Sequence, residues 1–363
     1  MIGTWTLSRY FARHYVTWFG VFLGALAGII FLFEVAELLR RAADMPGTSF
    51  GLVLQMGLYK LPDTVERVLP FVVLFAGVFT FWRLTRSQEL VIARAAGISA
   101  WQFLAPALFV TLFFSFLNVT LINPIGASLE GKYKQLESRY LQRVPTIELT
   151  GAGLWLRQRD SDHRYLLHAD HVEVQPLTLT PLMALIYDTS DHYLGRIDAP
   201  RAVLSDGYWD IENAWINWDQ QLPQHVDTYR LPTNLTIGKI QESMAAPNTI
   251  SFWELPGFIR ALKAIGLPPA RHELAFEGLL AQPVLLCAMV FFAAVFSLRM
   301  NRRGGIMGVV VGGVCLGIFV FVMNNVVSAL GVNQTLPVAA AAWAIPLVAL
   351  ALSNAALLYL EDG

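Results

Sequence analysis

The sequence predicts an α-helical membrane protein in which six transmembrane helices, three before and three after, flank an all-β insert. The first observation is composition, because 55% of the 363 residues are hydrophobic and only 15% are charged, against about 25% in ordinary soluble domains. The second is that six apolar stretches are long enough for a membrane-spanning helix, which needs about 20 residues. The third is that charged residues gather between residues 130 and 277, where 14 Lys or Arg and 19 Asp or Glu fall.

Three of the expected spans lie before the insert. Residues 16–33 are uncharged, too long for the apolar core of a signal peptide and without a small-residue cleavage site, so we expect a retained helix. The second span should cover residues 62–82, with Asp63 and Arg67 spaced to form an i,i+4 pair near its interfacial end. The third fits residues 101–122, which lie in a long uncharged stretch.

The other three spans follow the insert. Residues 278–298 form one apolar run of full bilayer length. Between Arg303 and Glu361 the chain is uncharged, and residues 331–337 have the composition of a turn, so two helices fit there. Because lipid offers the backbone no hydrogen-bond partner, each of these runs has to form a helix that satisfies its own backbone.

Arginines in the short loops predict which side of the membrane each loop faces. Eight of them define one side: Arg9, Arg13, Arg83, Arg86, Arg94, Arg299, Arg302 and Arg303. Six spans then put both termini and these loops in the cytoplasm, and residues 125–272 outside it. Three cations, Arg40, Arg41 and Lys60, lie on the outer side against this rule, either as interfacial anchors or as a functional site.

The insert, at about residues 145–245, has the pattern of an all-β domain, because strand-length apolar runs alternate there with polar turn clusters. The clearest runs are 154–156, 165–167, 182–187, 202–204, 209–211 and 216–218. A change in the apolar alternation near Asn213 predicts a β-bulge. Strands of this kind form a sandwich, a jelly roll or an open barrel.

Two further expectations concern the side chains of the insert and the segment after it. Five aromatic residues are expected mainly in its core: Trp155, Tyr187, Trp209, Trp215 and Trp218. Residues 251–265 carry apolar side chains at helical spacing, with Arg260 and Lys263 off that stripe. They are expected to form an amphipathic helix that lies on the outer leaflet or against the transmembrane bundle.

The sequence also argues against several function classes. The formal net charge of −1 removes a general electrostatic case for binding nucleic acid. Phosphate-binding, zinc-protease, serine-hydrolase and C-x-x-C patterns are missing from the sequence, so we expect no catalytic residue, no metal site and no cofactor bound by this chain. The two cysteines, Cys287 and Cys315, lie in apolar runs and provide no disulfide framework.

The loop at residues 83–99 is the most informative cytoplasmic segment. Ser87 is expected to cap a short helix that Gly97 ends. One side of this helix would carry Leu90, Val91, Arg94 and Ala95. A charged helix with an apolar face suits docking into a groove of another protein, although composition alone favours a solvated connection at the membrane interface.

The residues Arg86-Ser87-Gln88-Glu89-Leu90-Val91, followed by Arg94-Ala95-Ala96-Gly97-Ile98-Ser99, closely resemble the same loop of the LptF/LptG permease family of the lipopolysaccharide export transporter. The resemblance extends over almost the whole chain. Segments 37–41, 301–305 and 360–363 are more similar to the LptG branch of this family than to its LptF branch. The run Arg271-His272-Glu273-Leu274 and the later Pro283 also match the family pattern.

The resemblance implies a permease subunit of an ABC transporter, with a periplasmic β-jelly roll between its two sets of three spans. It would extract lipopolysaccharide from the inner membrane and pass it to a periplasmic bridge of jelly-roll proteins, for export to the outer membrane. The implied partners are an LptF-type permease, forming a heterodimer, and a cytoplasmic ATPase dimer that uses the ATP.

The resemblance also implies roles for two groups of residues. Glu89 takes the position of a coupling-helix glutamate, and the set expected to contact the ATPase is Arg86, Ser87, Glu89, Leu90, Val91, Arg94 and Gly97. Arg40 and Arg41 take the positions of basic residues that meet the phosphates of the lipid. Glu37 is spaced i,i+4 from Arg41 and is expected to hold that side chain until lipid arrives.

On this interpretation residues 1–124 hold spans 1–3 with the coupling loop, residues 125–250 the periplasmic jelly-roll-like domain with its linkers, and residues 251–363 the amphipathic helix and spans 4–6. The protein is expected in a bacterial inner membrane with both termini in the cytoplasm. One alternative is a non-transporting mechanotransmission subunit driven by a cytoplasmic ATPase. Another is a membrane-embedded enzyme, which needs a cluster of polar catalytic side chains that no predicted span contains.

Overall fold

The computed structural model describes residues 2–42, 49–95, 97, 99–137, 140, 147–150, 153–159, 163–174, 177–188, 192–205, 207–219, 221–233, 246–264, 268–299 and 306–361. The expected segment 301–305, the last two residues of the segment 360–363 and the turn residues 161–162 and 189–191 lie outside this set. The chain divides into a helical unit, with residues 1–141, 251–253 and 270–363, and a sheet unit, with residues 142–250 and 254–269.

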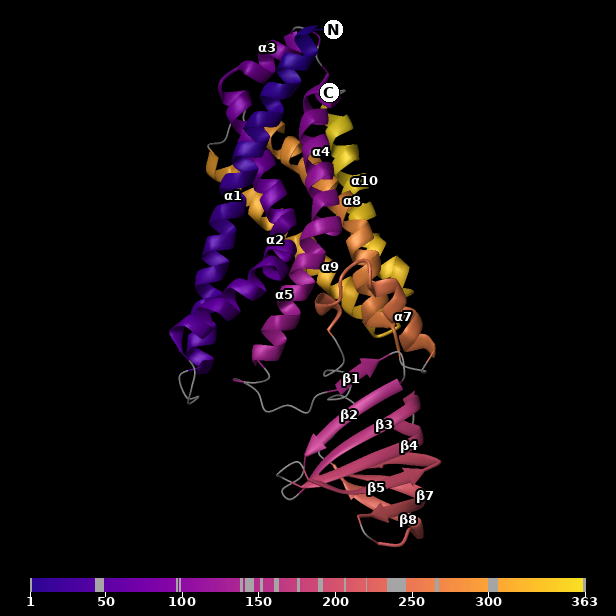
Figure 1. The fold of residues 1–363 in the computed structure, drawn as a ribbon. Coiled ribbons are helices and arrows are strands. Elements are labelled where there is room, and N and C mark those ends of the chain that lie inside the picture. The colour runs from indigo at the N-terminus through magenta and orange to yellow at the C-terminus, as the bar shows by residue number, and fades with distance from the viewer. Residues whose placement is uncertain are drawn as a thin grey trace. The chain divides into compact units, whose positions relative to one another are not determined.

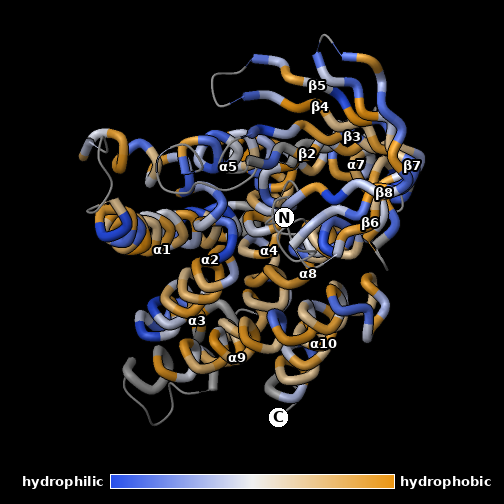
Figure 2. The backbone as a smooth tube through the Cα atoms, turned by 90° about the horizontal axis from the view of Figure 1, so that it is seen from below, coloured by the Kyte–Doolittle hydropathy of each residue, from blue (hydrophilic) through white to orange (hydrophobic). Residues whose placement is uncertain are grey.

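The helical unit contains long apolar helices together with shorter ones (Figure 1). They are α1 (Ile2–Ala42), α2 (Phe50–Arg86), α3 (Glu89–Ala95), α4 (Ala100–Leu117), α5 (Asn123–Leu136), α8 (Ala270–Arg299), α9 (Ile306–Val332) and α10 (Val338–Glu361). Among the described residues, six helical stretches are long and apolar enough to cross a membrane, which confirms the six predicted spans. Figure 2 shows that these helices are hydrophobic over most of their length.

Several helices are longer than the predicted spans, namely α1, α2, α8 and the continuous stretch from α4 to α5. The helix α2 begins at Phe50, where Ser49 Oγ accepts a hydrogen bond from Leu52 N, and it contains Pro62 and Pro70. Neighbouring helices can satisfy the backbone groups that such prolines leave open, so a transmembrane helix tolerates them. The π-helical segment η1 (Asn118–Ile122) joins α4 to α5, so this stretch continues beyond the predicted end of span 3.

Two local predictions in the helical unit are confirmed. Arg67 Nη2 donates to Asp63 Oδ2 at 2.6 Å, as the i,i+4 spacing predicts. The turn expected between the last two spans lies between the end of α9 and the start of α10. Figure 1 shows that α1 begins and α10 ends at the end of the helical unit that carries α3.

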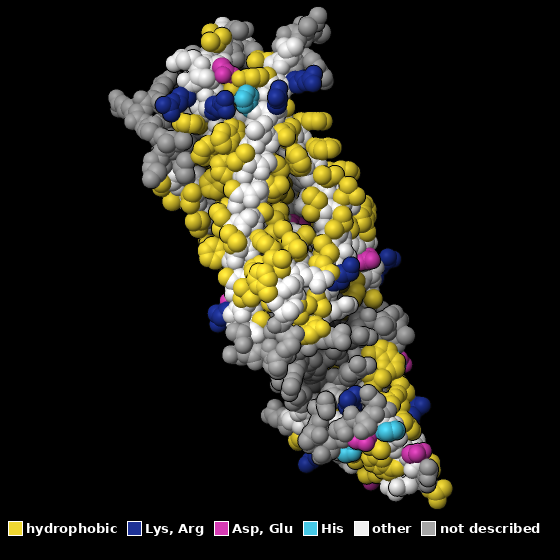
Figure 3. Space-filling model, turned by 60° about the vertical axis from the view of Figure 1, so that its left-hand side comes forward, with side chains coloured by type: hydrophobic (Ala, Val, Ile, Leu, Met, Phe, Trp, Pro, Cys, Tyr) yellow, Lys and Arg dark blue, Asp and Glu magenta, His cyan; other side chains and the backbone are white. Residues whose placement is uncertain are grey.

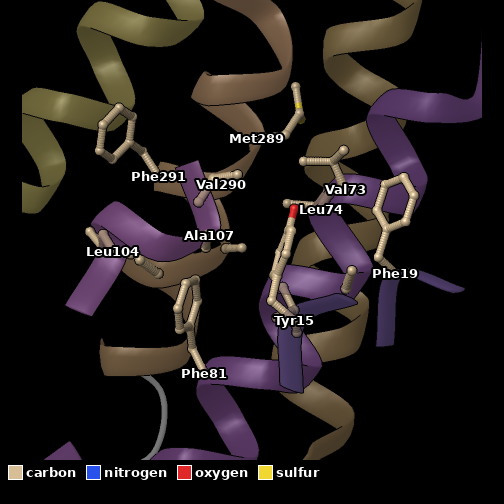
Figure 4. Packing of buried hydrophobic residues seen from close by; sticks show 14 of the residues in the cluster. Tyr15, Phe19, Val73, Leu74, Phe81, Leu104, Ala107, Met289, Val290 and Phe291 are labelled. Atoms are coloured by element: carbon tan, nitrogen blue, oxygen red, sulfur yellow. The ribbon is translucent and has the colours of Figure 1, made fainter. Parts of the chain in front are cut away.

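The core of the helical unit brings together α1, α2, α4 and α8 (Figure 4). Tyr15 is fully buried, and its hydroxyl is hydrogen bonded to Thr111 Oγ1 at 2.8 Å. A Cβ atom at Gly77 would lie 2.6 Å from Ala293 Cβ, so α2 and α8 approach closely at this glycine. Small residues allow such an approach, which supplies much of the packing between helices in a membrane.

Among its described residues, the sheet unit contains eight antiparallel strands. They are β1 (Ile147–Thr150), β2 (Gly153–Arg159), β3 (His163–Val174), β4 (Leu177–Asp188), β5 (Tyr193–Ala199), β6 (Arg201–Ser205), β7 (Tyr208–Trp218) and β8 (Gln224–Pro232). Each predicted strand run falls inside one of them. The strand order is β1-β2-β3-β4-β5-β7-β6, with β8 on β7 and a further pairing of β4 with β6.

The bulge predicted near Asn213 is wrong. The pairs on either side of this residue, Glu212 with Thr228 and Ala214 with Val226, keep one register with β8. Asn213 instead has a left-handed backbone, with φ at +52°. The other neighbour of β7 changes here from β6 to β5, so the change in alternation comes from a local backbone turn and not from an inserted residue.

Three of the five aromatic residues expected in the core are also placed differently. Trp209 is fully buried, but Trp215 is 52% exposed and its ring lies 4.9 Å from that of His225. After Asn213 the inward positions of β7 are Ala214 and Ile216, so Trp215 points outward. Trp218 is half-buried and packs against the core. Trp155 and Tyr187 are half-buried outside that cluster, where their rings lie 4.3 Å from His168 and 6.0 Å from Tyr193.

The segment after the sheet forms η3 (Pro247–Thr249) and α7 (Leu255–Ala264). Leu262 is fully buried in the same cluster as the inward side chains of the sheet, and Phe258 packs against that cluster. We had expected this amphipathic helix on the outer leaflet or against the bundle. The start of the segment does lie against the bundle, because the Phe252 ring stacks on Phe276 of α8 at 5.3 Å. Farther along, Leu262 instead covers the core of the sheet, where buried apolar side chains need a covering layer.

Candidate functional site

Two basic residues end α1, at the end of the helical unit away from α3 (Figure 1). Arg40 donates from Nε to Glu37 Oε2 at 2.8 Å and from Nη2 to Glu37 Oε1 at 2.7 Å, which is a bidentate contact. Arg41 donates from Nε to Glu37 Oε1 at 3.0 Å, as its i,i+4 spacing predicts. Glu37 therefore holds both arginines and not Arg41 alone.

Arg41 also reaches a second carboxylate. Its Nη1 lies 3.3 Å from Glu137 Oε1, and the Glu137 side chain is only 6% exposed. Glu137 further accepts hydrogen bonds from the Tyr133 hydroxyl at 3.1 Å and from Lys134 Nζ at 2.9 Å. No local sequence pattern indicates this network, because its members lie almost a hundred residues from Arg41.

The third outward cation, Lys60, has a partner of its own. Its Nζ donates to Glu34 Oε1 at 2.5 Å, and the same Nζ lies 5.3 Å from the centroid of the Tyr133 ring. Glu34 is therefore neutralised locally by Lys60. Arg40, with a side chain 75% exposed, remains the most accessible cation of this group.

The packing beneath these charges holds the ends of three helices together. Leu38 from α1, Met56 from α2 and Tyr133 from α5 are almost fully buried in one cluster. A Cβ atom at Gly57 would lie 2.9 Å from Val35 Cγ2, so α1 and α2 are in close contact here. This packing joins the helix end that carries Glu37, Arg40 and Arg41 to α2 and α5.

A pocket of about 520 Å³ lies beside the arginines. It is lined by Ile30, Phe33, Glu34, Ala36, Glu37 and Arg40. One part of this lining is apolar and the other carries the Glu37–Arg40 pair. The arrangement suits an amphipathic ligand whose anionic group replaces Glu37 on the arginines, since a guanidinium binds carboxylate and phosphate in the same bidentate way.

The predicted coupling loop lies at the opposite end of the helical unit, and its helix is α3. Ser87 does not cap α3, as we had expected. Its Oγ donates to Arg83 O at 3.0 Å and its backbone N–H bonds the same carbonyl, so it ends α2. Gln88, with φ at +64°, turns the chain, and its carbonyl accepts from Ile92 N at 3.0 Å. Gly97 has φ at +84°, which suits its predicted role in ending the helix.

The side chains of the coupling loop divide into buried and accessible ones. Leu90 is 1% exposed and belongs to the core of the helical unit, so it anchors α3 and is not free to meet a partner. Ile92 is 67% exposed, and the sequence analysis did not single it out. Glu89 is half-buried beside Tyr10, and the Arg86 guanidinium carbon lies 5.4 Å from the centroid of the Trp82 ring.

The remaining residues that the sequence singled out lie in α3 and α8. The backbones of Val91 and Arg94 lie in α3, but their side chains are not among those described. The segment 271–274 lies at the start of α8, and Pro283 lies inside that helix. Within the described part of the chain, no three His, Cys, Asp or Glu side chains are grouped so that they could hold a metal ion.

Comparison with known proteins gives two findings. The family described as "Lipopolysaccharide export system permease LptF/LptG" matches residues 9–359 of this chain. A protein of Haemophilus influenzae named "Lipopolysaccharide export system permease protein LptG" is 21% identical over 341 residues. The alignment covers 92% of this chain and 92% of that protein.

Proposed function

The chain belongs to the LptF/LptG permease family of the lipopolysaccharide export system, and on that premise we propose that Arg40 and Arg41 contact the lipid and that α3 contacts a separate ATPase. Its family and its six apolar helices make it a non-catalytic, multi-pass subunit of the inner membrane. The observation that carries the proposal is the pair of arginines held by one exposed glutamate. They lie beside a pocket whose lining is apolar on one side and charged on the other.

The proposed lipid contact is an exchange of anions. Without lipid, Glu37 pairs with both arginines. Lipopolysaccharide carries phosphates on its glucosamine head group, and these would replace Glu37 on Arg40 and then on Arg41. The acyl chains would lie along the apolar side of the pocket at Ile30 and Phe33. Glu137 keeps a second contact with Arg41 and holds its guanidinium in place during the exchange.

The energy for extraction would come from a partner, because this sequence contains no nucleotide-binding motif. We propose that a cytoplasmic ATPase dimer uses the ATP and receives α3 in a groove, with Glu89 and Ile92 at the contact. An LptF-type permease would form the other half of the membrane domain as a heterodimer. The sheet unit would then face a periplasmic bridge of jelly-roll proteins that carries lipopolysaccharide onward.

The lipid contact is tested by replacing both arginines with Ala in a reconstituted complex of this chain, its partner permease and its ATPase. Transfer of lipopolysaccharide out of the vesicle membrane should fall at least tenfold while the subunits still co-purify. The matched control is Arg67→Ala, which removes an exposed arginine that is also paired with an acid at i−4. Transport at the wild-type rate by the double variant would refute the lipid contact.

The proposed orientation, with the sheet unit in the periplasm and both termini in the cytoplasm, is tested separately by cysteine labelling in intact cells. In a background where Cys287 and Cys315 are replaced by Ala, an impermeant reagent should label Leu222→Cys, which is 86% exposed in the sheet unit. It should leave Ile92→Cys unlabelled until the inner membrane is opened. The reverse pattern would contradict the proposed topology.

A further inference from the structure

A second pocket, of about 280 Å³, lies between α1 and α2 at the end of the helical unit that carries α3. Its lining includes the polar residues Arg13, His14, Thr17 and Arg83 and the apolar residues Trp18 and Val21. Figure 3 shows Lys, Arg and His side chains gathered at this end, with a largely hydrophobic surface extending from it along the helices. This pocket is at the far end of α1 from Arg40 and Arg41, so it is separate from the proposed contact with the transported lipid.

The sequence predicts the depth of this pocket in the membrane. Arg13 lies just before the uncharged run of α1 begins, and Arg83 lies directly after the uncharged run of α2 ends. Because α1 and α2 run in opposite directions (Figure 1), both guanidinium groups lie at the same level, where lipid headgroups meet the hydrocarbon. Val21 lies about two turns farther along α1, roughly 12 Å deeper, at the level of acyl chains.

The charge in this pocket is largely unbalanced. Among the described residues, neither Arg13 nor Arg83 forms an ion pair, in contrast to Arg40 and Arg41 at the other end of α1. Glu89 lies beside Tyr10, which is part of the pocket lining. The Thr17 hydroxyl donates to Arg13 O at 2.9 Å, so its proton is not available to a ligand. Arg13 and Arg83 are therefore the charged donors that this lining offers to an anion, and the His14 ring adds a further N–H.

We propose that this pocket binds the phosphate of an anionic glycerophospholipid from the leaflet next to α3. Arg13 and Arg83 donate to the phosphate oxygens from two different helices, and a guanidinium offers a planar pair of donors for this contact. Trp18 and Val21 contact the first part of an acyl chain. A lipid bound in this way joins the start of α1 to the end of α2, directly before α3. Basic pockets between transmembrane helices are suited to anionic lipid headgroups.

The test is native mass spectrometry of the purified full chain, titrated with phosphatidylglycerol or phosphatidylcholine that carry the same acyl chains. The wild-type chain should bind phosphatidylglycerol preferentially. Arg13→Gln and Arg83→Gln should each lower its occupancy about fivefold, since one basic group at the membrane surface has an effect of this size. The matched control is Arg9→Gln, which removes the same charge from the same helix outside the pocket and should change occupancy less than twofold.

A second variant and a competitor separate the remaining explanations. Thr17→Trp fills the pocket without changing its charge, and it should also lower phosphatidylglycerol binding if the ligand enters the pocket. This variant keeps the test decisive if an arginine variant does not fold. Equal losses for Arg9→Gln and Arg13→Gln would mean diffuse electrostatic attraction and would overturn the site. Displacement of phosphatidylglycerol by an equal concentration of inorganic phosphate would assign the pocket to a free anion and would overturn the lipid assignment.

Discussion

Replacing Leu90 with Ala should release α3 from the helical unit while the rest of that unit stays folded. The Leu90 side chain is 1% exposed and packs in the core of the unit. Truncation of such a leucine to Ala destabilises its site by about 2–5 kcal/mol. Because α3 has only 7 residues, it cannot remain helical without its packing. The substitution therefore lowers the free energy that holds α3 against the helical unit.

The size of the expected effect follows from that range. A loss of 2 kcal/mol corresponds to about a 30-fold increase in the undocked population of α3, since 1.4 kcal/mol is a factor of ten. Hydrogen exchange of the amides at residues 89–95, measured on the purified full chain, should accelerate by at least about this factor. In a reconstituted complex, ATP hydrolysis should lose its stimulation by lipopolysaccharide, because α3 no longer transmits motion.

The control lies in the same helix. Ile92 is 67% exposed, so Ile92→Ala should leave hydrogen exchange in α3 unchanged and should instead weaken co-purification of the ATPase. The two variants remove side chains of the same size from the two sides of α3 and have different expected effects. Unchanged exchange at residues 89–95 in Leu90→Ala, or equal acceleration in both variants, would refute this assignment of buried and docking sides.

Three further changes have defined outcomes. Glu89→Lys reverses a charge at the proposed ATPase contact and should lower co-purification of the ATPase at least tenfold. Unchanged assembly together with unchanged activity would refute this contact. Glu37→Gln frees both arginines from their shared carboxylate and should slow the release of lipopolysaccharide by about two- to fivefold. Release is measured by photocrosslinking at successive times, and faster release in this variant would contradict the anion exchange. Gly77→Val places atoms against Ala293 and should sharply lower the folded yield measured by size exclusion, whereas Gly24→Val, with nothing within 4 Å of its added Cβ, should not.

The sequence was sufficient to predict the spans, since an apolar run of bilayer length has one stable structure in lipid. It was also sufficient for the pair of Asp63 with Arg67 and the contact of Glu37 with Arg41, because helical spacing alone brings these side chains together. The strand runs were located by their alternation, but the change near Asn213 was misassigned. A bulge and a left-handed residue change the alternation in the same way and differ only in the register with the next strand.

The long-range part of the site could not be predicted from the sequence. The contacts of Lys60 with Glu34 and of Arg41 with Glu137 depend on how the ends of α1, α2 and α5 pack, and no periodicity encodes that packing. The same limit applies to α3, where the pattern indicated an amphipathic helix but not which of its sides the helical unit buries. Leu90 was therefore expected at the partner contact, although it lies in the core.

The most direct test of the central claim is site-specific photocrosslinking at position 40 in a complex that still transports. The photoreactive residue replaces Arg40 while Arg41 is kept, and a control residue replaces Tyr359, which is 80% exposed at the far end of the helical unit. The account predicts a lipopolysaccharide adduct at position 40 and none at position 359. A transport-competent complex that captures lipopolysaccharide at neither position 40 nor position 41 would contradict it.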